Sequence, residues 1–232
     1  MIDRIMFPTM KDTGLSRSAE DYLKAVYSLN ERGEPAGTSE LARALDVQPG
    51  SVSGMIRRLA EDGLLEHEPY HGVRLTPEGS REALKVLRRH RIIESFLVRR
   101  LGYDWEDVHA EAERLEHAAS DRLIERMAEA MDHPATDPHG APIPTRHGKI
   151  AATPWPRLDE VAAGTRVTVR AVSDEDPERL RYFKSVGVVP GARALVQRSG
   201  MDGGPVTLIV EGASEPLSMR PAVARRVAVT EA

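Results

Sequence analysis

Side chains that can bind a metal ion are concentrated between residues 108 and 117. The four candidates at offsets 0, 4, 7 and 8 are His109, Glu113, Glu116 and His117. A helix of about 3.6 residues per turn places all four side chains on one face. Imidazole nitrogens and carboxylate oxygens that share a face can bind a divalent cation together, so this segment predicts a metal site.

A second pair of possible ligands precedes this segment. His90 and Glu94 have the i, i+4 spacing that directs both side chains to the same side of a helix. Two antiparallel helices would therefore direct six nitrogen and oxygen donors at a shared space. The alternative is a solvated acidic face with incidental histidines. Donors on both helices favour the metal site over that alternative.

The charge distribution points to the same part of the chain. Residues 101–146 contain 4 Lys and Arg against 11 Asp and Glu, and they hold four of the eight histidines, including His133 and His139. The chain has no cysteine, which excludes disulfides, thiolate catalysis, iron–sulfur clusters and cysteine-based zinc sites. Any metal must therefore be held by nitrogen and oxygen.

The composition indicates a soluble, cytosolic protein. The chain has 232 residues, of which 29% are charged. It contains no apolar run of about 18 residues and no apolar signal segment near residue 1, so neither a transmembrane helix nor a secretory leader is expected. This length allows one or two domains of ordinary size, or three small ones.

The elements that must position these ligands begin with two short helices. A capping box at residues 18–21 opens a helix that ends near residue 31, and residues 38–45 form a second helix. Asp21 has a simple structural explanation at this position. An acid in the first turn of a helix accepts from free backbone N–H groups and interacts favourably with the helix dipole.

The next elements complete a DNA-binding unit. A turn at residues 47–51 leads into a third helix, and its buried stripe consists of Val52, Met55, Ile56 and Leu59. Apolar stretches at residues 64–65 and 73–75 then predict a two-stranded hairpin. Three helices and a hairpin are typical of a winged helix-turn-helix. A compact three-helix unit can also bind proteins, but the hairpin favours DNA.

The rest of the chain divides into long helices and short strands. One helix runs from residue 76 to about 101, a second spans about residues 105–131, and prolines prevent a regular helix over residues 132–144. Beyond residue 158, β-branched runs predict a small barrel with strands at residues 167–170, 194–196, 206–210 and 227–229. The predicted fold is mainly α with a β C-terminal domain.

A series of motifs runs along nearly the whole chain. They lie at residues 18–23, 52–53, 59–64, 75–79, 89–91, 108–117 and 138–144, and in the C-terminal part at Leu180, Gly187, residues 190–191 and residues 204–205. In these motifs the sequence resembles the diphtheria-toxin-repressor family of metal-dependent transcriptional regulators. The C-terminal part resembles the SH3-like, FeoA-type domain of that family.

The resemblance implies four segments. A winged helix-turn-helix would occupy residues 1–80 and a helical metal-binding and dimerisation domain residues 81–146. A linker over residues 147–157 would lead to the SH3-like barrel over residues 158–232.

The resemblance also implies two metal sites. The primary, activating site would consist of Asp21, Glu113, Glu116 and His117, and the ancillary site of His90, Glu94 and His109. Asp21 and Glu113 are carboxylates, as in the manganese branch of the family, whereas the iron branch usually has Met and Cys there. Because hard oxygen ligands suit Mn²⁺, the resemblance implies activation by Mn²⁺, with Fe²⁺ as the alternative.

Two positions depart from the family pattern. Lys24 stands where the manganese branch has a glutamate ligand, which argues against a binuclear site of that type. In long members the C-terminal domain lends ligands to the ancillary site, and the match places these at Asp176 and Arg179. Since Arg179 cannot bind a metal, the remaining candidate is Asp176, or one of its neighbours Glu175 and Glu178.

The function that the resemblance implies is a homodimeric, metal-activated repressor of metal-ion homeostasis genes, without a membrane partner. A metal between Asp21 and the ligands of the dimerisation domain would fix the angle between the two domains, and so the spacing of the two recognition helices on double-stranded operator DNA. The residues expected to contact DNA are Gln48, Pro49, Ser51, Ser53, Arg57, Arg58 and His71.

Two other functions are weighed against this one. A carboxylate-bridged di-metal enzyme needs a Glu-x-x-His motif twice, and residues 106–109 supply it once. A winged-helix regulator that senses a small molecule would leave the acidic face as ordinary surface. Metal-dependent DNA binding would separate all three functions.

Overall fold

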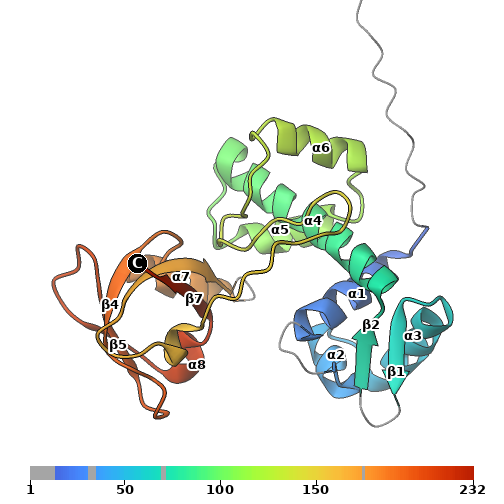
Figure 1. The fold of residues 1–232 in the computed structure, drawn as a ribbon. Coiled ribbons are helices and arrows are strands. Elements are labelled where there is room, and N and C mark those ends of the chain that lie inside the picture. Colours follow the sequence, from blue (N-terminus) through green and yellow to red (C-terminus); the bar gives the residue numbers. More distant parts are fainter. Residues whose placement is uncertain (1–13, 31–34, 69–71, 174–175) are drawn as a thin grey trace, which may run out of the picture. The chain divides into compact units, whose positions relative to one another are not determined.

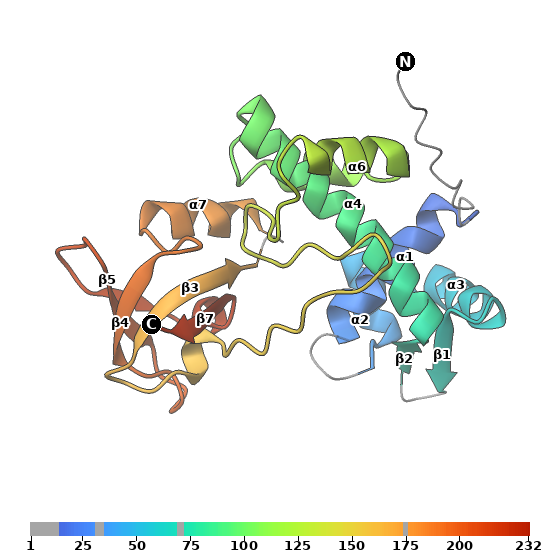
Figure 2. The same ribbon diagram turned by 45° about the horizontal axis from the view of Figure 1, so that its top comes forward.

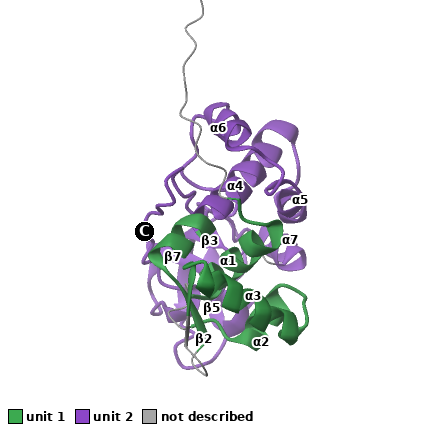
Figure 3. Cartoon of the chain, turned by 90° about the vertical axis from the view of Figure 1, so that its right-hand side faces the viewer, with its two compact units in different colours: residues 1–83 green, residues 84–232 purple. Residues whose placement is uncertain are grey.

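The computed structural model describes residues 14–30, 35–68, 72–173 and 176–232. The chain divides into two compact units, residues 1–83 and residues 84–232 (Figure 3). Among the described helices, none combines the length and the apolar character needed to cross a bilayer.

The first unit is a winged helix-turn-helix, as predicted (Figure 1). Its elements are α1 (Arg17–Asn30), α2 (Thr38–Ala44), α3 (Pro49–Glu61), β1 (Leu65–Glu68) and β2 (Gly72–Leu75). The two strands pair antiparallel, with Leu65 opposite Leu75. Asn30 ties the end of α1 to β2, because its Nδ2 donates to the Val73 carbonyl at 3.2 Å and its Oδ1 accepts from the Leu75 N–H at 3.3 Å.

The start of α1 differs from the prediction. The hydroxyl of Ser16 accepts a hydrogen bond from the Ala19 N–H at 3.3 Å, so Ser16 caps the helix in place of Ser18. Glu20 is the acid of the first turn, and Asp21 lies beyond it. The predicted placement of Asp21 in the first turn is therefore wrong.

The third helix follows the predicted pattern. Pro49 occupies its first turn, and Val52, Ile56 and Leu59 are buried in the core of the first unit. Met55 is partly buried against the same core. The apolar stripe at i, i+4 and i+7 thereby leaves the opposite face of α3 to solvent.

The second unit starts with a helical layer. It contains most of α4 (Pro77–Leu101), together with α5 (Val108–Leu115) and α6 (Asp121–Glu129). The views in Figures 1 and 2 show α6 beside α4, and Nη2 of Arg88 on α4 lies 2.8 Å from Oε1 of Glu125 on α6. Their shared core includes Ile92, Ile93 and Ile124.

The single helix predicted over about residues 105–131 is wrong. The chain forms α5 and α6 with a break between them, and Glu116 is the C-cap of α5. The break has a local cause, since the Ser120 hydroxyl accepts from the Leu123 N–H at 3.3 Å and starts a new helix. Glu116 and His117 therefore follow the end of α5.

The remainder of the second unit is a five-stranded antiparallel sheet in the order β6-β5-β4-β3-β7. The strands are β3 (Arg166–Val172), β4 (Arg193–Arg198), β5 (Val206–Val210), β6 (Leu217–Met219) and β7 (Val227–Glu231). The short helices of this part are η1 (Leu158–Glu160), α7 (Pro177–Ser185) and α8 (Pro221–Ala224). The four predicted strands are confirmed, whereas β6 and the helices were not predicted.

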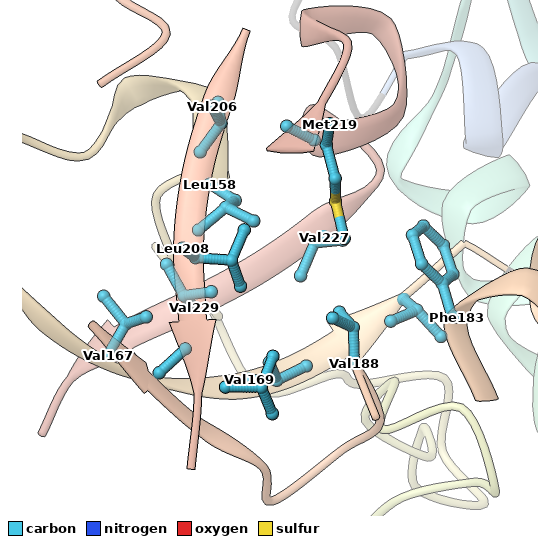
Figure 4. Close-up of a cluster of buried hydrophobic side chains, with 14 of the residues drawn as sticks. Leu158, Val167, Val169, Phe183, Val188, Val206, Leu208, Met219, Val227 and Val229 are labelled. Atoms are coloured by element: carbon cyan, nitrogen blue, oxygen red, sulfur yellow. The ribbon is translucent and has the colours of Figure 1, made fainter. Parts of the chain in front are cut away.

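The interior of this barrel is aliphatic (Figure 4). Alternate residues of β3 and β5, such as Val167, Val169 and Leu208, point inward, and Phe183 of α7 covers one side of the core. Along β5 buried residues alternate with partly exposed ones, which is the period of two of a strand with one face in a core.

Candidate metal centre

His90 of α4 lies at the centre of a cluster of acids and imidazoles. Its Nδ1 lies 2.6 Å from Oε2 of Glu116, and its Nε2 lies 3.0 Å from Oε1 of Glu94 and 3.1 Å from Nδ1 of His109. His90, Glu94 and Glu116 are all buried. A fixed arrangement of carboxylate oxygens and ring nitrogens of this kind can hold a divalent cation.

Glu113 lies on the solvent side of this cluster. Its Oε1 is 3.7 Å from Nδ1 of His90 and 3.7 Å from Nε2 of His109, and its side chain is 36% exposed. Donor atoms of His90, His109 and Glu113 lie within 4.8 Å of one another. This group is open enough for a cation to enter from solvent.

His117 extends the cluster beyond Glu116. Its Nε2 lies 3.3 Å from Oε1 of Glu116, and only 8% of its side chain is exposed. Glu116 therefore has one carboxylate oxygen beside His90 and the other beside His117. The six ligands predicted on α4, on α5 and just beyond it thus lie in one continuous set of contacts.

A further group of possible ligands lies behind His90. Donor atoms of Glu94, Asp137 and His139 lie within 4.8 Å of one another, and all three residues are buried. Oε2 of Glu94 is 3.8 Å from Nδ1 of His139, and neither atom has a hydrogen-bond partner among the described residues. Two buried polar atoms that face each other without a hydrogen-bond partner are a possible place for a cation.

The charge state of Glu94 suits this role. Burial opposes ionisation of Glu94, but the positive charge of His90 and hydrogen bonds from His109 and His90 hold the pKa of its carboxyl well below the usual range. Glu94 therefore remains a carboxylate at neutral pH.

The loop between Thr136 and Pro142 presents the other two donors. Asp137 Oδ1 accepts from the N–H groups of His139 at 2.8 Å and Ala141 at 3.0 Å. His139 Nε2 lies 2.7 Å from the carbonyl of Trp105. Because a carbonyl only accepts, Nε2 carries a proton, and Nδ1 is the ring nitrogen that faces Glu94.

Sequence reasoning did not single out Asp137 and His139 as candidate ligands. A usable signal is the sequence Asp-Pro-His-Gly at residues 137–140, which places a carboxylate and an imidazole two residues apart ahead of a glycine. The pair lies in a proline-rich loop, where no helical or strand periodicity indicates the direction of a side chain.

The remaining predicted ligands, Asp21 and Asp176, belong to other elements of the chain. Asp21 belongs to the first unit, on α1, and is half-buried there. Asp176 caps α7: its Oδ1 accepts from the N–H groups of Glu178 and Arg179, and its Oδ2 pairs with Nη2 of Arg179 at 3.0 Å. Within the described ranges, Asp176 belongs to no group of metal-binding donors. Glu175 lies outside the described residues.

The predicted DNA-contacting residues of α3 lie on its exposed face. Gln48 is the N-cap of the helix and Pro49 is its first residue. The exposed side chains beyond them are those of Ser51, Ser53, Arg57 and Arg58. His71 lies outside the described residues.

Three family profiles match successive parts of the chain. Residues 14–73 match the N-terminal DNA binding domain of iron dependent repressors, and residues 76–145 match their metal binding and dimerisation domain. Residues 157–231 match the FeoA domain.

Curated relatives agree with these profiles. The chain is 35% identical over 208 residues to the iron-dependent repressor IdeR of Mycobacterium tuberculosis, an alignment that covers 84% of this chain and 89% of the relative. It is 37% identical over 135 residues to the diphtheria toxin repressor of Corynebacterium efficiens, covering 58% of each chain.

Solved structures include manganese regulators. A manganese-dependent transcriptional repressor in complex with manganese has a TM-score of 0.87 and 38% identity, covering 92% of this chain and 100% of the other. The manganese regulator SloR has a TM-score of 0.79 and 30% identity, covering 92% and 98%. These relatives are repressors and not enzymes, so the di-metal enzyme and small-molecule-sensor interpretations are wrong. The chain belongs to the diphtheria-toxin-repressor family of iron-dependent and manganese-dependent transcriptional repressors.

Proposed function

We propose that this protein is a cytoplasmic, Mn²⁺-activated repressor. It would control genes of metal-ion homeostasis. The observation that carries the choice of metal is the ligand chemistry. Every candidate ligand is a carboxylate or an imidazole, and the chain has no cysteine. Mn²⁺ lies at the weak end of the divalent affinity order and favours carboxylate oxygen, whereas softer metals gain most from sulfur.

The activating site in this proposal consists of Asp21, Glu113, Glu116 and His117. Asp21 lies on α1 of the first unit, whereas the other three residues belong to the second. Ligands drawn from both units would favour one arrangement of the DNA-binding unit over all others. In the metal-free chain, repulsion among the carboxylates would disfavour that arrangement, so metal binding shifts the population towards the DNA-binding form.

The ancillary site in this proposal is built on His90, Glu94 and His109. Asp137 and His139 replace Asp176 as its further ligands, because their donor atoms lie within 4.8 Å of those of Glu94, whereas Asp176 belongs to no such group among the described residues. His90 contacts ligands of both sites, which supports coupling between them.

The DNA partner in this proposal is a palindromic operator read by two copies of α3. Ser51 and Ser53 in the first turns of α3 would contact base edges, while Arg57 would bind phosphate. The homodimer would form through the helical layer, whose exposed apolar side chains include Leu101, Tyr103, Leu115 and Leu123. Exposed apolar side chains concentrated in one layer are typical of a subunit interface.

An anisotropy titration tests the proposal. The full chain is titrated onto DNA from upstream of candidate metal-transport genes, in parallel with Mn²⁺, Fe²⁺, Zn²⁺ and a chelator, under anaerobic conditions. We expect Mn²⁺ to give the strongest binding at physiological metal concentrations. Stronger binding with Fe²⁺ would favour the iron-dependent relatives as the functional parallel, and equal binding in chelator would overturn metal activation.

A further inference from the structure

We propose that Gly50 and Gly54 of α3 are specificity-determining residues for the DNA that the proposed repressor binds. Without side chains at these two positions, the backbone of α3 approaches the floor of the major groove and contacts the C5 methyl group of a thymine. The thymine is thereby recognised through van der Waals contact, without a hydrogen bond to its edge. This inference rests on the proposed DNA-binding function and names a base that the operator contains.

The first support is the position of the two glycines on α3. Gly50, Gly54, Arg57 and Glu61 recur at offsets 0, 4, 7 and 11, so they form one ridge along the helix, and all four are exposed. The buried stripe of α3 lies on the opposite side of the helix. In a helix-turn-helix unit, this helix enters the major groove and contacts base edges with its N-terminal residues. The two glycines therefore lie where α3 comes nearest to the base pairs.

The second support is that the fold gives no reason for either glycine. Neither has a positive φ, and a Cβ atom at either position would meet nothing within 4 Å among the described residues. Gly79 of α4 differs, because a Cβ atom there would overlap the Leu64 carbonyl. A glycine inside a helix lowers the folding equilibrium constant about two- to fivefold relative to alanine. Gly50 and Gly54 therefore weaken α3 without a packing benefit in the free chain, which points to a role in a complex.

The third support is the charge around this ridge. Residues 47–60 include no acidic residue, and Arg57 and Arg58 are exposed near the end of this segment. Ser51 and Ser53 flank the ridge on opposite sides, and both side chains are short. A flat, uncharged surface therefore lies beside two guanidinium groups that can bind phosphate. This combination suits the floor of a DNA groove and the phosphates along its walls.

The chemistry of the major groove selects thymine. Backbone amides inside a helix are already hydrogen-bonded, so a ridge of glycines presents C–H groups to a partner. The base edges in the major groove present hydrogen-bonding groups, whereas the C5 methyl group of thymine is apolar. A helix with its side chains is about 10–12 Å wide and the groove is about 12 Å wide, so a missing side chain decides how deeply the helix enters. Gly50 and Gly54 therefore favour a T·A pair where α3 lies deepest.

Gly54→Ala and Gly50→Ala, made separately in the full chain, test the proposal through two measurements with opposite signs. Urea unfolding in chelator measures stability. We expect Gly54→Ala to raise the folding equilibrium constant about two- to fivefold, and Gly50→Ala, in the first turn, not to lower it. Ser28→Ala is the control, because Ser28 is exposed on α1 and its replacement also favours helix. Lower stability in both glycine variants would overturn the proposal, because the fold itself would then need the glycines.

DNA affinity is measured by anisotropy with saturating Mn²⁺. The probe is a duplex that the Mn²⁺-loaded wild-type chain selects from a randomised pool. We expect each glycine variant to bind this duplex about tenfold or more weakly, the cost of a lost base-pair contact, and to bind a random-sequence duplex as wild type does. Ser28→Ala should bind both duplexes as wild type does. Unchanged affinity for the selected duplex in both glycine variants would overturn the proposal. A wild-type chain that selects no duplex would overturn the proposed function itself, and this inference with it.

Uracil in place of thymine, at each position of the selected duplex in turn, removes the C5 methyl group alone. At one position of a half-site this change should weaken wild-type binding about fourfold, the value of one buried methyl group. In Gly54→Ala the added methyl group collides with that of the thymine, so the same change in the duplex should strengthen binding. A Gly54→Ala chain that prefers thymine there as strongly as wild type does would overturn the proposal. So would a wild-type chain that tolerates uracil at every position.

Discussion

Nδ1 of His90 lies 2.6 Å from Oε2 of Glu116, although 26 positions separate the two residues in the sequence. Nε2 of the same ring lies 3.0 Å from Oε1 of Glu94. One buried imidazole thus contacts a carboxylate of each proposed metal site. A change at either site should therefore alter the other site, because it shifts the His90 ring that contacts both.

Replacing His117 or Glu113 by Ala should abolish the stimulation of DNA binding by Mn²⁺ and leave the fold intact, because each change removes a ligand and no core residue. The checks are anisotropy with and without Mn²⁺ and circular dichroism. His133→Ala is the control, since His133 is exposed and belongs to none of the donor groups found among the described residues. A wild-type response in both ligand variants would show that the activating site is misassigned.

Arg57→Ala should weaken binding to specific and nonspecific DNA alike. Loss of one phosphate contact reduces the slope of log K against log salt by about one unit. The measurement is anisotropy at several salt concentrations with saturating Mn²⁺. Arg198→Ala, an exposed arginine of the barrel, should leave the slope unchanged. If the slope is also unchanged in Arg57→Ala, this side chain does not contact phosphate.

The double change Asp21→Met and Glu113→Cys should shift the metal preference away from Mn²⁺. It replaces two hard oxygens with a thioether and a thiolate, and Mn²⁺ depends on carboxylate more than Fe²⁺ or Co²⁺ does. Half-activation concentrations for DNA binding are compared under anaerobic conditions. If the ratio of the Mn²⁺ value to the Fe²⁺ value does not rise, Asp21 and Glu113 do not set the selectivity.

Glu94→Gln should destabilise the metal-free chain by about 1.5–3 kcal/mol near pH 6, the range for a lost hydrogen bond to a buried charge. Its pKa is lowered in the fold, despite burial, by His90 and His109. The charge therefore stabilises the folded state above the unfolded pKa of 4.5, and this contribution is lost as pH falls from there towards the lower folded pKa.

Urea unfolding of wild type and Glu94→Gln with chelator, at pH 6 and at pH 3, measures this effect. The difference in unfolding free energy should shrink at the lower pH. Glu129→Gln, whose side chain is 43% exposed, is the control and should show little difference at either pH. A difference that stays constant with pH would mean that the charge of Glu94 does not stabilise the fold.

The sequence by itself determined the family, the winged helix-turn-helix and four of the barrel strands, and it predicted six candidate ligands that lie together in the second unit. These features depend on local pattern. Apolar spacing such as that of Val52, Ile56 and Leu59 specifies the buried face of a helix, and i, i+4 spacing such as that of His90 and Glu94 specifies a shared side. Such patterns depend on the helix or strand alone, so they can be recognised in the sequence without knowledge of the tertiary structure.

Only the tertiary structure decided which ligands meet. Asp137 and His139 lie beside Glu94 on a loop that contacts Arg91, Trp105 and Val172, all distant from it in sequence. The break at Ser120 likewise depends on one side-chain hydrogen bond that competes with a continuing helix. Periodicity records which face of an element is buried, but the partner across that face is selected by packing over the whole unit.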